Sequence, residues 1–188
     1  MANPVRSAFG LKPARIPDQH ELVVVELTSG TILGIGDTLS ISASTPDDAT
    51  TPKVTRGTAS GTVSHVYMGL KDPTHDSVNG YYDGVATDYG LALPVNNNRE
   101  FLVMEDADGG ALSAANIGNV ADLTTAADAD SVTGRSAFAL DSSTAATGGA
   151  KHVVILGLSK AANIATGANA IWRVRINELQ LVDGFAGI

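Results

Sequence analysis

Few residues in this sequence combine the types and spacing that enzymes and metal sites use. Cysteine is absent, which excludes thiolate zinc sites, cysteine nucleophiles and disulfides. The D-P-T-H-D segment comes closest to a metal-binding motif, yet its Asp-Pro start is typical of a solvated turn. No two of the four histidines have the H-x-x-x-H spacing of a histidine-based metal site, so we predict no metal site at any of them. They are His20, His65, His75 and His152.

A second acidic stretch superficially resembles the start of a calcium loop. Glu105, Asp106 and Asp108 precede two glycines, but the D-x-D-x-D-G run and the ligating glutamate of an EF-hand are missing. We interpret it as an acidic turn, with calcium bound in a different kind of loop as the alternative. The sequence therefore predicts no metal site and no cofactor.

Two glycine-containing segments fail the tests for catalytic or nucleotide-binding motifs. Gly57–Gly61 does not match the G-x-S-x-G motif of a nucleophile elbow. Gly34-Ile35-Gly36 lacks the third glycine and the following helix of a dinucleotide site. We therefore predict no catalytic residues and expect that the protein is not an enzyme.

The elements that would position any site are short strands. Blocks rich in β-branched and apolar residues are separated by Gly, Asn, Asp and Pro, and no long amphipathic helix appears. We expect an all-β fold, a compact β-barrel or β-sandwich of the jelly-roll or tulip-like kind with long loops. Residues 1–20 are predicted to form an extended N-terminal arm and residues 21–188 a single β domain. The predicted strands are Glu21–Leu27, Thr31–Ile35, Thr38–Ala43, Thr62–Met68, Arg99–Glu105, Ser136–Asp141, His152–Leu158 and Ile171–Leu181.

The last predicted strand has the clearest alternation. Trp172, Val174 and Ile176 alternate with Arg173 and Arg175, so one face should enter the core while two guanidinium groups face solvent or a partner. The apolar parity then changes, which predicts a bulge or turn at Asn177-Glu178. By contrast, the run from Val153 to Leu156 does not alternate, and we expect that strand to be covered on both faces.

Charge divides the chain into a basic start and an acidic remainder. Residues 1–17 hold Arg6, Lys12 and Arg15 without an acid, while residues 18–188 hold nine basic and twenty acidic groups. The whole chain has a net charge of -8, which argues against nucleic-acid binding. No apolar stretch is long enough for a membrane span, and we expect a protein made in the cytoplasm without a membrane partner.

The basic start has two interpretations. It is either a frayed terminus or an arm that lies on an acidic neighbour, anchored by apolar side chains. The candidate arm contacts are Arg6, Phe9, Leu11, Lys12, Arg15 and Ile16.

Three tyrosines form a further candidate contact surface. Tyr81, Tyr82 and Tyr89 lie close to Asn79-Gly80 and Asp83-Gly84, two dipeptides that favour tight turns. Each tyrosine provides a large rigid face and a hydroxyl group, which suits a protein or glycan partner. The alternative is that these rings merely cover one end of a barrel.

Several segments, in their order along the chain, resemble the capsid decoration or cement proteins of tailed bacteriophages. The start, Met1–Pro4 and Gly10–Pro13, is similar to the leader of that family. The later segments carry most of the likeness: Val103–Asp106, Gly109–Leu112, Leu140–Thr147, Ile155–Leu158, Trp172–Asn177 and Ala186–Ile188.

The resemblance implies a virion structural protein on the exterior of the capsid. Its partners would be the major capsid protein and further copies of itself, as a homotrimer or, alternatively, a dimer. Residues 1–17 would reach across neighbouring capsid subunits, and Arg173 and Arg175 would add partner contacts. The alternatives are a glycan-binding module and a head-fibre or tail structural module of a phage particle.

Overall fold

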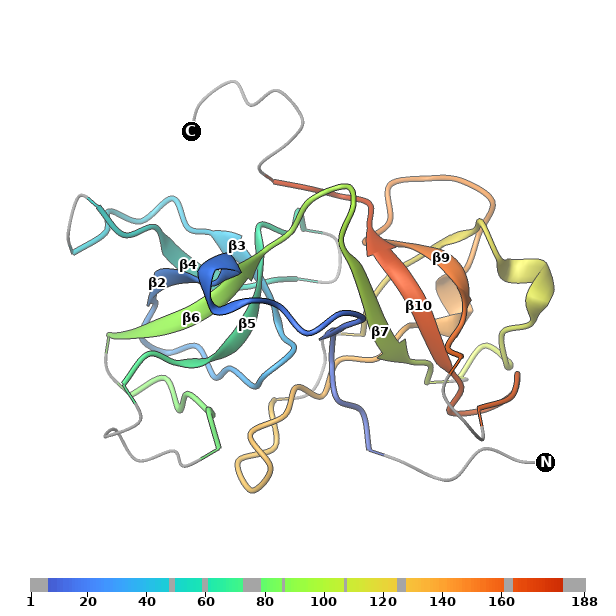
Figure 1. Ribbon diagram of the computed structural model, residues 1–188, viewed down its shortest axis with the longest axis horizontal. Coiled ribbons are helices and arrows are strands. Elements are labelled where there is room, and N and C mark those ends of the chain that lie inside the picture. The colour runs from blue at the N-terminus through green and yellow to red at the C-terminus, as the bar shows by residue number, and fades with distance from the viewer. Residues whose placement is uncertain are drawn as a thin grey trace.

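A computed structural model confirms the all-β prediction (Figure 1). It describes residues 7–47, 50–58, 61–72, 79–85, 87–106, 108–124, 128–160 and 164–180. Helical structure among them is limited to the 3-10 turns η1 (Gln19–Glu21), η2 (Ala114–Asn116) and η3 (Ser142–Thr144). No helix in this described part is long and apolar enough to cross a membrane.

Five strands close into a barrel in the order β2-β4-β3-β5-β6. All neighbours pair antiparallel except β2 and β4, which are parallel. Buried aliphatic side chains and the Tyr67 ring fill the interior. The strands are β2 (Val23–Leu27), β3 (Thr38–Ile41), β4 (Lys53–Arg56), β5 (His65–Leu70) and β6 (Asp88–Pro94).

The remaining strands form an open antiparallel sheet in the order β1-β7-β10-β9-β8. A second core cluster contains Phe101 and Trp172 of this sheet together with Val66 and Leu93 of the barrel, so apolar packing joins the two sheets. The strands are β1 (Lys12–Pro13), β7 (Glu100–Met104), β8 (Val120–Ala121), β9 (Val153–Leu158) and β10 (Ile171–Ile176).

The alternation predicted for β10 is confirmed. Trp172, Val174 and Ile176 are buried, whereas Arg175 is exposed and Arg173 partly exposed. The chain turns after Ile176, and Leu179 returns to the core, as the change of parity predicted. The side chains of this strand thus divide into a core face and an outer face.

Strand β9 was predicted to be covered on both faces, by a second sheet or by a neighbouring subunit; within one chain it is fully covered on one face only, and cover by a neighbouring subunit stays a prediction. The residues of β9 alternate between buried and partly exposed positions, and the partly exposed side chains Val154, Leu156 and Leu158 are apolar as well. Leu158, which pairs with Trp172 beyond the register shift, packs against the main core. The register between β9 and β10 shifts at Arg173 and Val174. Gly157, with φ +153°, lies opposite Arg173. Within one chain, the absence of alternation in the sequence therefore marks partly exposed apolar side chains rather than a second covering layer of this chain.

The second half of the predicted N-terminal arm lies on the body of the protein. The backbone N–H of Leu11 donates to the carbonyl of Gly36 at 2.9 Å, and that of Ala14 donates to Glu100 at 2.9 Å. Gly10 has φ +67°, and a Cβ there would lie 2.5 Å from the Ser136 side chain, so glycine is required. The N–H of Ala14 points toward β7, so the backbone nitrogen of Pro13 points toward the free edge of the sheet. Proline has no N–H, and this edge therefore lacks a donor that another strand could use.

Local pattern misassigned part of the sheet structure. Thr31–Ile35 and Ser136–Asp141, both predicted as strands, form only isolated bridges. Strand β6 was not predicted, because Gly90 and Pro94 interrupt its apolar run. Gly90 is needed there, since a Cβ would lie 2.9 Å from the Tyr67 ring.

Candidate interaction face

The outer side of the open sheet presents two rows of side chains whose positions follow from the strand register. In one row Lys12 pairs with Leu102 and Leu102 with Arg173. In the next row Arg175 lies between Glu100 and Val154, and Val154 pairs with Val120. We call this set of seven residues the sheet face: Lys12, Glu100, Leu102, Val120, Val154, Arg173 and Arg175.

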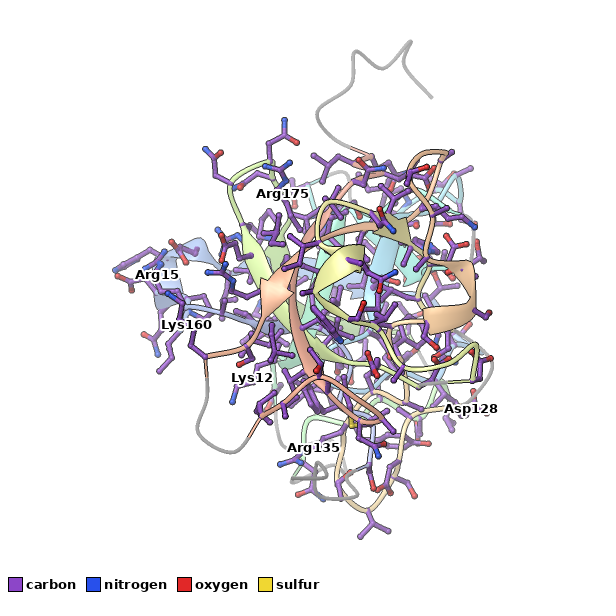
Figure 2. The ribbon with its side chains drawn as sticks, turned by 90° about the vertical axis from the view of Figure 1, so that its right-hand side faces the viewer. Lys12, Arg15, Asp128, Arg135, Lys160 and Arg175 are labelled. Atoms are coloured by element: carbon purple, nitrogen blue, oxygen red, sulfur yellow. The ribbon has the colours of Figure 1, made fainter. Side chains whose placement is uncertain are left out.

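The sheet face is positively charged, although the chain as a whole is acidic. It carries three cations and one carboxylate, against a net charge of -8 for the full sequence. Arg173 Nη1 lies 3.7 Å from Glu100 Oε2, while Arg175 Nη1 donates to the carbonyl of Asn97 at 3.3 Å. Figure 2 views the molecule from the side of this sheet, where Lys12, Lys160 and Arg175 lie around it. This arrangement suits an acidic partner surface with apolar patches.

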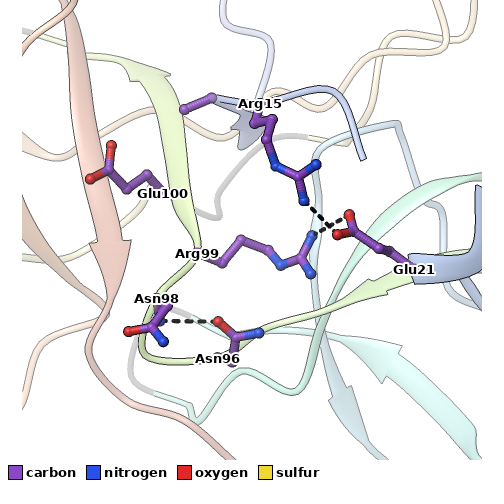
Figure 3. A pocket seen from close by; sticks show the side chains of 7 residues that line it. Arg15, Glu21, Asn96, Asn98, Arg99 and Glu100 are labelled. Carbon is purple, nitrogen blue, oxygen red and sulfur yellow. Dashed lines mark hydrogen bonds and ion pairs between the residues drawn. The ribbon is translucent and has the colours of Figure 1, made fainter. Parts of the chain in front are cut away.

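A polar cavity of about 500 Å³ adjoins the sheet face (Figure 3). Within it Glu21 lies between two guanidinium groups, with Oε1 2.5 Å from Arg15 Nη2 and Oε2 3.3 Å from Arg99 Nη1. The hydrogen bond from Arg15 is the main reason that the pKa of Glu21 is lowered. We call this cavity the arginine pocket; it is lined by Ala14, Arg15, Glu21, Asn96, Asn98, Arg99 and Glu100.

A second cavity, of about 970 Å³, runs beneath the N-terminal segment. Phe9, Leu11 and Ile16 line it together with side chains of both sheets, such as Met68 and Leu102. Ile16 is largely exposed, but Leu11 is 1% exposed and belongs to the main core. This corrects the prediction for Leu11, which anchors the chain to its own body instead of to a neighbour.

The other predicted arm cations occupy different places. Lys12 lies on the sheet face with Arg173 and Arg175, and Arg15 lines the arginine pocket next to it. Arg6 lies outside the described residues. The structure thus brings four predicted contact residues to one side of the molecule.

The tyrosines do not share one exposed platform. Tyr82 is 3% exposed and its hydroxyl donates to the Thr28 carbonyl at 3.3 Å, which corrects its assignment as a contact residue. Tyr81 and Tyr89 are half-buried, and Lys71 Nζ lies 5.8 Å from the centre of the Tyr89 ring. Tyr82 therefore belongs to the barrel core, as the barrel-covering alternative predicted.

Two buried histidines have structural partners. His65 Nδ1 lies 2.8 Å from Ser64 Oγ, and that hydroxyl donates to the Leu39 carbonyl at 3.0 Å. Ser64 Oγ therefore accepts from His65, so the imidazole nitrogen that faces it carries the proton and is not a base for the serine. His152 Nε2 contacts the Thr58 carbonyl at 2.7 Å and fixes a loop to β9.

The acidic turn contains a cluster that the sequence only partly indicated. Carboxylate oxygens of Asp106, Asp108 and Asp141 lie within 4.8 Å of one another. Backbone N–H groups of the η3 turn already donate to two of them, Ser142 to Asp106 and Ser143 to Asp141, each at 3.0 Å. Glu105 points the other way, because its Oε2 accepts from the buried Trp172 indole at 2.6 Å. His75 and Asp76 of the D-P-T-H-D segment lie outside the described residues.

The Glu21–Arg99 contact is the part of the candidate site that sequence reasoning missed. The two residues are 78 positions apart, and neither stands in a motif. The sequence gave one signal for this contact: the basic start that contains Arg15 holds no acid, and the first acid of the chain is Asp18.

No protein-family model, curated protein or solved structure matches the chain.

Proposed function

We propose that this chain is a virion structural protein of a tailed bacteriophage that binds the outer surface of the major capsid protein shell and stabilises the head. The observation that carries the proposal is the sheet face. Cations and apolar side chains stand in fixed register on a five-stranded sheet of an otherwise acidic chain. The resemblance of the C-terminal segments to capsid decoration proteins supplies the partner.

A sheet face suits repeated contact with a regular lattice. Its side chains project from hydrogen-bonded strands, so little ordering is required on binding. Charge complementarity would orient the protein on an acidic capsid surface, and Leu102 and Val154 would contribute apolar contacts between the charges. Several copies held together, as a homotrimer or alternatively a dimer, would each need only a modest patch because binding is multivalent.

The N-terminal segment contributes to this surface from two places. Lys12 is part of the sheet face, and Arg15 lines the arginine pocket beside it. Deleting residues 1–17 would remove Leu11 from the core, so it would confuse folding with binding. Deleting residues 1–6 is the cleaner test of an arm.

The proposal is tested by adding purified protein to undecorated heads and imaging them. We expect regular density on the outer capsid surface, with light scattering of the free protein giving the number of subunits. Empty capsid surfaces at saturating protein would contradict the proposal. Stacked rings or tubes of the free protein would favour the tail alternative, and glycan-array binding abolished by removal of Tyr81 or Tyr89 would favour the glycan alternative.

A further inference from the structure

We propose that Arg15 and Arg99 form a carboxylate-exchange site, in which Glu21 is the resident carboxylate and a carboxylate of the docked partner takes its place. This inference rests on the proposed function, because docking through the sheet face is what brings the partner carboxylate to the arginine pocket.

The geometry is that of one carboxylate shared by two guanidinium groups from different segments. Arg15 comes from the N-terminal segment and Arg99 from the turn before β7, and Glu21 ends the η1 turn between them (Figure 3). Glu21 Oε2 also accepts from the backbone N–H of Asp18 at 3.2 Å. A single side chain therefore fastens the η1 turn to two arginines.

The arginines retain capacity for a second anion. The Arg15 side chain is 75% exposed, and the buried Nε of Arg99 has no hydrogen-bond partner among the described residues. Two guanidinium groups against one carboxylate leave the cluster with a charge of about +1, since arginine stays protonated. The second acid of the pocket, Glu100, lies beside Arg173 rather than beside this pair.

The pocket has room and polar groups for an incoming side chain. Its volume is about 500 Å³, and the exposed amides of Asn96 and Asn98 line it next to the arginines. Amide and guanidinium donors can together satisfy both oxygens of a carboxylate. An aspartate or glutamate on a partner loop is therefore the chemistry that fits.

Exchange should be weak for free anions and effective for a docked partner. Glu21 is tethered, so it competes at the high effective concentration of an intramolecular group. A partner held on the neighbouring sheet face gains the same advantage, whereas a small carboxylate in solution does not. Replacement of Glu21 would release the η1 turn from Arg15 and Arg99, which couples docking to a rearrangement of the N-terminal segment.

The test measures binding of glutarate, a free dicarboxylate, by NMR of the Arg Nε–H and Asn side-chain signals, with sodium chloride keeping the ionic strength constant. Glu21→Gln removes the resident competitor and should raise the glutarate affinity about fivefold or more, because apparent affinity scales with the fraction of protein whose site is free to bind. Glu178→Gln makes the same charge change elsewhere and should leave the affinity unchanged. Adding Arg99→Gln to Glu21→Gln should abolish binding.

An unchanged or lower affinity in Glu21→Gln, or binding that survives Arg99→Gln, would overturn the inference. Circular dichroism establishes that each variant is folded. If Glu21→Gln does not fold, the wild-type titration decides, because shifts of Arg99 Nε at high glutarate support exchange and shifts confined to other residues refute it. Heads that bind the protein while glutarate fails would refute exchange alone; glutarate binding without head binding would refute the proposed function alone.

Discussion

The buried His65 should make the stability of the protein depend on pH. His65 is 4% exposed in β5, and burial lowers its pKa from 6.5 to about 4. In the unfolded chain the imidazole regains its ordinary pKa, so between these values only the unfolded state binds the proton. The free energy of unfolding is therefore unaffected by this group above pH 6.5 and falls as the pH drops from 6.5 toward 4. From pH 8 to pH 5 this one group should lower the free energy of unfolding by about 2 kcal/mol.

Other buried acids act in the opposite direction, so the comparison needs a variant. Burial raises the pKa of Glu105 and of Asp37, and both groups favour the folded state more strongly at low pH. The variant His65→Gln keeps these acids and removes the imidazole. Urea unfolding at pH 8 and pH 5, followed by the fluorescence of the single tryptophan, Trp172, gives both free energies. The wild type should lose about 2 kcal/mol more than the variant over this interval; equal losses would refute the reasoning.

Three further substitutions test the core and the N-terminal segment. Trp172→Phe keeps a large ring but removes the indole donor of Glu105, which leaves only the Leu112 N–H on that oxygen. Urea unfolding, followed here by circular dichroism because the variant has no tryptophan, should show a loss of about 1–3 kcal/mol in the free energy of unfolding. A loss below about 0.5 kcal/mol would show that this hydrogen bond contributes little. In the wild type, the raised pKa of Glu105 should make stability decline as the pH rises above 4.5, and Glu105→Gln should flatten this decline. Thermal unfolding of both proteins from pH 4 to pH 8 measures the difference, and an identical pH dependence would contradict the assigned cause. Gly10→Ala should lower the free energy of unfolding by at least about 1 kcal/mol, because φ is +67° and the new methyl group would contact Ser136. Wild-type stability of this variant would mean that the N-terminal segment relaxes freely.

Local pattern predicted the features that depend on adjacent residues. The alternation around Trp172 predicted which side of β10 enters the core, and the change of parity after Ile176 predicted the turn that returns Leu179 to the core. The core position of Leu11 was not predictable, because nothing near it in the sequence specifies that Gly36 and Phe138 will hold its segment. Strand β6 was missed since the close approach of Tyr67 that requires Gly90 is a tertiary contact.

The sequence also predicted only part of the candidate site. Arg173 and Arg175 were identified from alternation alone, whereas their meeting with Lys12 depends on β1 joining the sheet edge. The arginine pocket combines residues 15, 21 and 99, and only the fold brings these positions together.

The most direct test of the central claim is the affinity for undecorated heads of two charge-reversal variants, measured by cosedimentation. Arg175→Glu reverses an exposed cation of the sheet face, and Lys71→Glu makes the same charge change at an exposed cation outside it. If the sheet face binds the capsid, Arg175→Glu should weaken binding about tenfold or more, with a reduced dependence on salt, while Lys71→Glu stays close to wild type. Equal affinities for the two variants would contradict the claim.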